Sequence, residues 1–424
     1  MKFISTRDPE HRATLSAAIE RGIAPDGGLY VPERFPLLIE EDLEDPDTLS
    51  ELGVQLLAPF FAGDPLEAEL RAICREAFDF PIPLRPLQSR TAVLELFHGP
   101  TAAFKDVGAR FLAACIARLN QDVERPLTVL VATSGDTGGA VAAAFHARPG
   151  VEVVVLYPRG MVSPRQEKQL TCWGGNVTAL RVAGDFDVCQ RLVKEAFSDP
   201  ELRERRRLTS ANSINVGRLL PQMIYYAAAS LRYRRRQGLE PGFIIPTGNL
   251  GNAVACLWAR AMGLPIREVV LAVNANRSIP AFLESGRWAP EATVTTLASA
   301  MDVGNPSNME RVQHLFPSMV EVRAKLRAFS VGDAEIREQI RSGPQRWGEV
   351  WDPHTATAAA VRERLDTEDW ILVATAHPAK FEQVVEPLIG SEVPPPPELA
   401  ALLERPSYAG DLVPTLDALR AALT

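Results

Sequence analysis

Three polar segments of this chain directly follow predicted strands, which is where parallel α/β sheets bind their ligands. Residues 133–139 read TSGDTGG, residues 247–252 read TGNLGN, and residues 375–380 read TAHPAK. The first two lead into predicted helices, so their backbone amides could hold an anion at a helix N-terminus. For residues 133–139 the alternative is an ordinary turn in which Ser or Thr caps the helix. A structural role is the alternative for His377 in the third segment.

The segment at residues 247–252 could bind a phosphate without a positively charged side chain. Its two glycines and two asparagines allow a tight turn in which neutral amides converge. The segment lacks the lysine of the GxxxxGK[ST] pattern, and the chain contains no GxGxxG. The sequence therefore disfavours ATP and NAD as ligands.

Lys105 is the candidate nucleophile. It lies just inside a predicted helix at residues 104–119, which follows a predicted strand at residues 93–97 and the turn Gly-Pro-Thr at residues 99–101. A lysine that is desolvated in a crevice has a lowered pKa and can attack an aldehyde. The alternative is a solvated lysine at the start of a helix.

A polar loop at residues 208–218 shows little helical signal before Leu219. Asn212, Ser213 and Asn215 could donate hydrogen bonds to an anion, and Arg218 could offer two parallel N–H groups. A loop held by its own hydrogen bonds is the alternative.

Apolar runs alternate with helices after residue 86, a pattern typical of a parallel sheet that is covered on both faces. Strands are predicted at residues 93–97, 127–132, 151–156, 177–182, 243–246, 268–273 and 370–374. Helices are predicted at residues 104–119, 139–146, 164–170 and 186–197, and another begins at Ala253. We therefore expect two α/β lobes, with the ligand in the crevice beyond the carboxyl ends of the strands.

The domain organisation is predicted from changes in pattern. Residues 1–82 form a mainly helical N-terminal domain that ends at a cluster of prolines at residues 81–86. Residues 125–204 form a small α/β domain, and residues 83–124 with 205–424 form the large cofactor-binding domain. The proline run at residues 394–397 is expected to be a stiff connector to one or two last helices.

Composition excludes several classes of function. The 424 residues carry a net charge of −8, so no overall positive field attracts nucleic acid or a membrane, and the arginine clusters at 203–207 and 232–236 are interpreted as solvated helix faces. No apolar run reaches the length of a membrane helix, and the N-terminus lacks a secretion signal. Five scattered cysteines without a CxxC pair predict neither a metal site nor disulfides. The cytoplasm is the expected location.

Taken together, the segments resemble one family, the threonine synthases, which are fold-type II (tryptophan synthase β-like) enzymes that depend on pyridoxal 5'-phosphate (PLP). The resemblance extends over nearly the whole chain. Its motifs are DGGLYVP at 26–32, ELFHGPT at 95–101, FKD at 104–106, ATSGDTG at 132–138, LYPRG at 156–160, SANSIN at 210–215, AMD at 300–302 and TAHPAK at 375–380.

The resemblance implies a role for each candidate residue. Lys105 would hold the cofactor as a Schiff base and carry protons, with Phe104 packed beside it, and Thr375 would bind the pyridine nitrogen. Asp136 stands where many relatives have an asparagine near the ring hydroxyl, and Leu250 where an aromatic or small residue is common. The cofactor phosphate would be bound by Gly248, Asn249, Leu250, Gly251 and Asn252. The substrate would be bound by Thr133, Ser134, Asn212, Ser213 and Arg218.

The resemblance also implies a reaction, in which a carbon–oxygen lyase converts O-phospho-L-homoserine and water into L-threonine and phosphate. Two alternatives stay open: a related threonine/serine dehydratase or phospholyase, and a catalytically silent PLP-binding protein. Members of the family occur as monomers and as homodimers. No metal, nucleic acid or membrane partner is expected.

Overall fold

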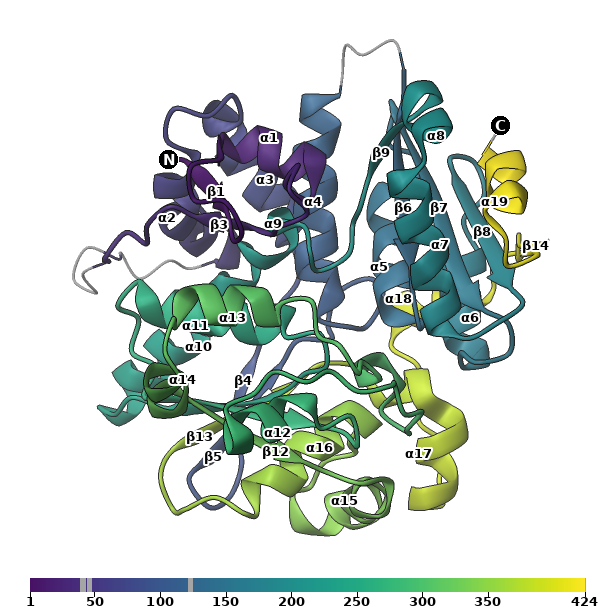
Figure 1. The fold of residues 1–424 in the computed structure, drawn as a ribbon. Helices are drawn as coiled ribbons and strands as arrows, with labels where there is room; N and C mark the ends of the chain where they lie inside the picture. Colours follow the sequence, from purple (N-terminus) through teal and green to yellow (C-terminus); the bar gives the residue numbers. More distant parts are fainter. Residues whose placement is uncertain (39–42, 44–47, 121–124, 424) are drawn as a thin grey trace.

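A six-stranded sheet forms the centre of the larger lobe (Figure 1). In the computed structural model, which describes residues 1–38, 43, 48–120 and 125–423, its strand order is β12-β11-β10-β13-β5-β4. Neighbouring strands pair in parallel, except for the antiparallel pair of β4 and β5. The strands are β4 (Leu84–Pro86), β5 (Thr91–Glu95), β10 (Gly242–Pro246), β11 (Glu268–Val273), β12 (Leu326–Ser330) and β13 (Trp370–Ala374).

Alternate residues of the central strands pack on opposite faces of this sheet. On one face, Ile244 and Leu372 share a buried apolar cluster with residues of α15 (Asp333–Arg346) and α16 (Pro353–Arg362). On the other face, Phe243 and Ile371 share a cluster with residues of α10 (Gln222–Gln237) and α11 (Gly251–Ala261). Because both faces are covered, these strands are continuous apolar runs.

A second sheet, with five parallel strands, forms the centre of the smaller lobe. Its order is β14-β8-β7-β6-β9. Helix α5 (Asp136–Phe145) packs on one face, α7 (Phe186–Ser198) packs on the other, and α19 (Leu416–Leu423) packs against α7. The strands are β6 (Leu127–Ala132), β7 (Val151–Pro158), β8 (Val177–Val182), β9 (Arg207–Thr209) and β14 (Gly410–Leu412).

The N-terminal domain is mainly helical, and it contains a small antiparallel sheet that was not predicted. The sheet consists of β1 (Phe3–Ser5), β2 (Arg12–Ala13) and β3 (Tyr30–Pro32). The helices are α1 (Leu15–Arg21), α2 (Leu49–Phe61) and α3 (Leu70–Ala77). Helices α1 and α3 pack on α4 (Lys105–Leu119), so this domain supports the helix that begins at the candidate nucleophile.

The remaining elements are short helices around the two sheets (Figure 1). They are α6 (Pro164–Thr171), α8 (Pro200–Arg205), α9 (Val216–Leu219), α12 (Ser278–Ser285), α13 (Met309–Leu315), α14 (Met319–Lys325), α17 (Glu382–Ile389), α18 (Pro397–Leu403) and the 3₁₀ turns η2 (Glu67–Glu69), η3 (Ser299–Met301) and η4 (Pro378–Phe381). Nowhere in the described ranges does a helix combine the length and apolar composition that crossing a bilayer requires.

The predicted strands and the observed ones differ mainly at the edges of the sheets. Strands β6, β8, β11 and β13 have the predicted bounds, whereas β5 begins and ends two residues before the predicted range of 93–97. Within the two large sheets, the strands that were not predicted are β4, β9, β12 and β14, and these are the edge strands. Edge strands are short and partly exposed, so they lack the continuous apolar pattern of the interior strands.

Two strands, β9 and β14, belong to a different sheet from the one that the predicted domain bounds imply. Residues 205–424 were expected in the larger lobe, but β9 and β14 pair within the smaller sheet, and α19 packs there as well. The expected boundary at residue 124 lies outside the described residues. The domain bounds therefore stay a prediction, with these two strands assigned to the smaller lobe.

A buried arginine joins the N-terminal domain to the polar loop of residues 208–218. Arg311, in α13, is fully buried, and its Nη2 donates to the carbonyl oxygens of Tyr30 at 2.9 Å and Ile214 at 2.7 Å. Its Nη1 donates to the carbonyl oxygen of Ser213 at 3.0 Å. Burial lowers the pKa of Arg311 to about 9, so the side chain stays charged at neutral pH.

We expect Arg311→Leu to lower the free energy of unfolding by about 3 kcal/mol, because it leaves several buried carbonyl groups without donors. Urea unfolding measures the change. Arg337→Leu, at an exposed position of α15, is the control and should change the free energy by no more than about 0.5 kcal/mol. Equal effects of the two substitutions would contradict the role of Arg311.

Candidate active site

The candidate residues follow neighbouring strands in both sheets. Lys105, the loop at residues 248–252 and Thr375 follow β5, β10 and β13, which are adjacent in the larger sheet. Residues 133–136 and the polar loop of residues 208–218 follow β6 and β9, which are adjacent in the smaller sheet. Because the carboxyl ends of parallel strands lie at one edge, each sheet presents its candidate residues together.

Lys105 is held beside Thr375 by backbone contacts. The N–H of Phe104 donates to the carbonyl oxygen of Thr375 at 2.8 Å, and Ala103 forms an isolated antiparallel bridge with Ala376. Lys105 is the first residue of α4, and its Nζ lies 4.3 Å from the centroid of the Phe104 ring. The side chains of both residues are partly exposed.

The charge state of Lys105 is shifted by its surroundings. Although Lys105 as a whole is partly exposed, the protein packed around its amine desolvates it and lowers its pKa to about 8; the positive charges of Arg218 and Lys380 act in the same direction, and Asp136 opposes them. An ordinary lysine has a pKa of 10.5. A larger fraction of this amine is therefore neutral, and able to act as a nucleophile or base, near neutral pH.

The loop between β10 and α11 presents backbone amides that have no protein partner. Among the described residues, the N–H groups of Gly248, Asn249, Leu250 and Gly251 donate to no protein acceptor. Leu250 adopts a left-handed conformation with φ of 62° and is fully buried. A Cβ atom on Gly248 would lie 2.6 Å from Cα of Met301, so this position requires glycine. The side chain of Asn252 holds the loop in shape, because its Nδ2 donates to the carbonyl oxygen of Pro246 at 3.0 Å and its Oδ1 accepts from Oγ1 of Thr247 at 2.7 Å.

Ser213 connects the polar loop of residues 208–218 with the loop between β10 and α11. Its Oγ accepts hydrogen bonds from Nδ2 of Asn249 at 2.7 Å and from Nδ2 of Asn308 at 3.2 Å. Asn308 also donates to the carbonyl oxygen of Asn249 at 2.9 Å. The structure thus places Ser213 against the loop predicted to bind the cofactor phosphate. Asn308 has no role in the sequence-based prediction, because its position beside Asn249 depends on the fold.

Thr133, Ser134 and Asn212 lie at the end of β6. Oγ1 of Thr133 accepts from the N–H groups of Gly135 at 3.0 Å and Gly138 at 2.9 Å, so it satisfies a donor in the first turn of α5, whereas the N-cap residue itself is Gly135. Nδ2 of Asn212 donates to the carbonyl oxygen of Ala132 at 3.2 Å, while its buried Oδ1 has no partner. Ser134 is partly exposed.

Arg218 is almost fully buried, with 2% of its surface exposed. Its Nη1 donates to the carbonyl oxygen of Ala211, and its buried Nε has no hydrogen-bond partner among the described residues. Burial lowers the pKa of Arg218 to about 10, with Asp106 and Tyr225 opposing the shift, so the guanidinium group is charged at neutral pH. A buried cation with an unsatisfied donor is suited to an anionic ligand.

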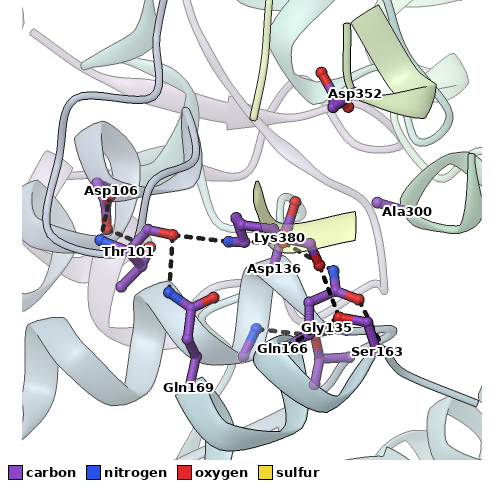
Figure 2. A network of polar contacts seen from close by, with 12 residues as sticks. Thr101, Asp106, Gly135, Asp136, Ser163, Gln166, Gln169, Ala300, Asp352 and Lys380 are labelled. Atoms are coloured by element: carbon purple, nitrogen blue, oxygen red, sulfur yellow. Dashed lines mark hydrogen bonds and ion pairs between the residues drawn. The ribbon is translucent and has the colours of Figure 1, made fainter. Parts of the chain in front are cut away.

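Asp136 forms an ion pair that the sequence did not indicate (Figure 2). Nζ of Lys380 lies 2.8 Å from Oδ1 of Asp136, and Nε2 of Gln166 donates to the same oxygen at 3.0 Å. Burial alone would raise the pKa of Asp136, but the charges of Lys380 and His354 and the contacts with Lys380 and Gln166 lower it below the usual value. Asp136 is therefore ionised. Lys380 is the last residue of the TAHPAK motif, but sequence alone cannot show that a lysine is buried.

Thr375 and His377 have different surroundings. The N–H of Thr375 is bonded to Oγ1 of Thr355 at 3.3 Å, and its own side chain makes no hydrogen bond to the described residues. Nδ1 of His377 accepts from the N–H of Ala379 at 3.2 Å, and burial lowers the pKa of His377 to about 4. This arrangement matches the structural alternative for His377, which caps η4.

The residues present fit PLP. Three adjacent strands are followed by a lysine with a lowered pKa, by the loop between β10 and α11, which requires glycine, and by a threonine hydroxyl. These three groups match the aldehyde, the phosphate and the ring nitrogen of the cofactor, in that order. No group of three His, Cys, Asp or Glu side chains suited to a metal ion occurs in the ranges that the structure describes. The five cysteines are buried and form no disulfide.

Comparisons with known proteins agree with this chemistry. Residues 81–375 match the family model of pyridoxal-phosphate dependent enzymes, residues 2–78 match that of the threonine synthase N terminus, and residues 355–422 match that of the threonine synthase C-terminal region. The threonine synthase of Haemophilus influenzae is 41% identical over 429 residues, covering 100% of this chain and 99% of that relative.

Two solved structures are similar over the full length. The crystal structure of threonine synthase from Escherichia coli has a TM-score of 0.92 at 38% identity and covers 100% of this chain and 99% of its own. The structure of PLP-bound threonine synthase from Brucella melitensis has a TM-score of 0.91 at 34% identity, with 100% and 98% covered.

Fold and site together define a PLP-dependent enzyme of fold type II. The chain belongs to the threonine synthase family. The resemblance, the fold class and the cofactor predicted from the sequence are thus confirmed.

We expect Gly248→Ala to weaken PLP binding about 10-fold, because overpacking against the backbone of Met301 costs 1–3 kcal/mol. Titration of cofactor-free protein with PLP, followed by visible absorbance, measures the dissociation constant. Gly332→Ala is the matched control, because a Cβ atom there meets nothing within 4 Å. Equal PLP affinities of the two variants would show that residue 248 does not shape the loop between β10 and α11.

Proposed function

We propose that this enzyme converts O-phospho-L-homoserine and water into L-threonine and inorganic phosphate. The observation that carries the proposal is the presence of two separate anion-binding arrangements, which follow strands of different sheets. Among the described residues, the amides of Gly248 to Gly251, after β10 of the larger sheet, have no protein acceptor, and Nε of the buried Arg218, in α9 after β9 of the smaller sheet, has no hydrogen-bond partner. A cofactor phosphate accounts for the first arrangement and a substrate phosphate for the second.

The cofactor is bound in this proposal by residues from both lobes. Lys105 holds it covalently, Phe104 packs beside it, Thr375 binds the ring nitrogen and Asp136 lies near the ring hydroxyl. The phosphate is bound by the loop Gly248, Asn249, Leu250 and Gly251, with Asn252 holding the loop in shape through Pro246. When bound, PLP supplies a conjugated ring that accepts the electrons released by proton removal.

Lys105 is the proposed proton carrier. With substrate bound, its amine would be free to remove the protons at Cα and Cβ, to return one at Cγ and, after water has added at Cβ, to return one at Cα, while the remaining proton of the water goes to the released phosphate. A pKa of about 8 suits this role, because the amine can both accept and donate a proton near neutral pH. Thr375 offers a neutral hydroxyl rather than a carboxylate, so a ring nitrogen bound to it would stay largely unprotonated.

The substrate phosphate is assigned to Arg218, Asn212 and Ser213, and the substrate carboxylate to Thr133 and Ser134. The unpartnered Nε of Arg218 supports the first assignment. Oγ of Ser213 already accepts two hydrogen bonds, so its own proton is available for an anion. The phosphate that these residues retain after it leaves Cγ can serve as a second base.

We further propose a cytoplasmic location, with the protein a monomer or a homodimer. Five buried cysteines without a disulfide are typical of a reducing compartment.

The proposed reaction is tested by incubating the enzyme with PLP and O-phospho-L-homoserine and measuring phosphate, threonine and 2-oxobutyrate together. Equal amounts of phosphate and threonine are expected. A phospholyase would release 2-oxobutyrate with the phosphate, and a silent cofactor-binding protein would release neither. Lys105→Ala should abolish both the visible absorbance band of the bound cofactor and turnover.

We expect Arg218→Lys to raise the Michaelis constant about 100-fold while the visible band of the bound cofactor persists, because the charge remains but the fork of N–H donors is lost. Steady-state kinetics and the absorbance spectrum measure the two effects. Arg203→Lys, at an exposed position of α8, is the control. An unchanged Michaelis constant in Arg218→Lys would contradict the assignment.

A further inference from the structure

Lys380 is a buried cation at the junction of the two lobes (Figure 2). It lies in η4, shortly after β13 of the larger lobe, and its side chain has no exposed surface. Its Nζ donates to the carbonyl oxygen of Thr101 and lies beside Oδ1 of Asp136, each at 2.8 Å. Thr101 precedes α4, whereas Asp136 is the first residue of α5 in the smaller lobe. One ammonium group therefore connects the lobes.

Two glutamines of α6 close this arrangement into a ring. Nε2 of Gln166 donates to Oδ1 of Asp136 at 3.0 Å, and Nε2 of Gln169 donates to the carbonyl oxygen of Thr101 at 2.9 Å. Each of the two acceptors thus receives one donor from Lys380 and one from α6. The backbone of Lys380 contributes as well, because its carbonyl oxygen accepts from Oγ of Ser163 at 2.7 Å.

The charges of Lys380 and Asp136 compensate each other in a buried setting. Asp136 is 5% exposed, and removal of either partner would leave an uncompensated charge in the protein interior. Both contacts of the Asp136 carboxylate are made by Oδ1. Oδ2 accepts no hydrogen bond from the part of the chain that the structure describes, so it remains available to a ligand.

The ring also reaches the nucleophile. The N–H and Oγ1 of Thr101 donate to the carboxylate of Asp106 at 2.9 Å and 2.7 Å, and Asp106 directly follows Lys105. The charged groups that act on Lys105 are Arg218 from α9, Asp136 from α5 and Lys380 from η4, and the titratable His354 from α16 acts on Asp136. Lys380 also acts on Asp106 and on His377.

We propose that Lys380 is a positioning residue for the reaction. Its ammonium group fixes Asp136 against the turn that precedes Lys105, neutralises the charge of that carboxylate and leaves Oδ2 to accept a hydrogen bond from the cofactor. Lys380 thereby sets the electrostatic surroundings of the amine without contacting the reacting atoms. The inference rests on the proposed role of Lys105 as the cofactor lysine.

A double-mutant cycle tests the inference on the PLP-loaded enzyme without substrate. Lys380→Met removes the cation and keeps most of the side-chain volume, Asp136→Asn removes the anion at nearly constant shape, and the third variant combines both. The readout is the pH midpoint at which the visible band of the lysine-bound cofactor changes. The dissociation constant for PLP is measured in parallel, and Lys325→Met, at an exposed position, is the control.

The direction of each shift follows from the charges. Lys380→Met leaves the anion of Asp136 uncompensated, which favours the protonated form of the nearby nitrogen and should raise the midpoint by about one pH unit. Asp136→Asn leaves the cation and should lower the midpoint by a similar amount. The double variant should titrate close to the native enzyme, and the PLP affinity lost in each single variant should be partly restored.

Other outcomes overturn the inference. A purely structural ion pair would lower the melting temperature in each single variant and leave the midpoint unchanged. If Lys380→Met does not fold, Asp136→Asn alone decides, since an unchanged midpoint there contradicts the proposal. If the native enzyme shows no visible band that Lys105→Ala removes, the role of Lys105 fails first and the inference fails with it.

Discussion

Parallel pairing of β10, β13 and β5 is the constraint on which the active site depends. Parallel strands connected by helices must all end at the same edge, so the residues that follow these three strands are brought together whatever their distance in sequence. The pairing of β5 and β13 continues beyond the strands in the hydrogen bond from the N–H of Phe104 to the carbonyl oxygen of Thr375. This bond places the first turn of α4 directly beside the end of β13. The smaller sheet applies the same rule to β6 and β9, and it thereby supplies the groups assigned to the substrate.

Neutral donors and compensated charges allow a net acidic chain to bind anions. In the proposed site the cofactor phosphate needs no cation, because the amides of the loop after β10 have no acceptor among the residues that the structure describes. Arg218 and Lys380 are buried cations, and both lower the pKa of Lys105 in addition to contacting their own hydrogen-bond partners. Desolvation is the largest influence on the pKa of the Lys105 amine, so the packing around this residue itself increases the neutral, nucleophilic fraction.

Buried polar groups, rather than apolar surface alone, determine how the domains meet. Arg311 joins the N-terminal domain to the loop that carries Ser213, and the ring of Thr101, Lys380, Asp136 and Gln166 joins the two lobes. Apolar packing is tolerant of small shifts, whereas hydrogen-bonded groups without access to water must keep their geometry. Such contacts are suited to placing residues from separate elements at defined positions around a cofactor.

The sequence by itself determined the interior of the fold and the order of the motifs. Strands that are buried on both faces are legible as apolar runs, so β6, β8, β11 and β13 could be predicted to the residue, and Lys105, Thr375 and the loop after β10 followed from the strand ends. Only the tertiary structure decided which strands form the edges, because short and half-exposed segments have no distinct pattern of their own. It also decided the surroundings of Asp136 and Lys380. The burial of a lysine is a property of the helices that enclose it, and α5 and α6 are distant from Lys380 in the sequence.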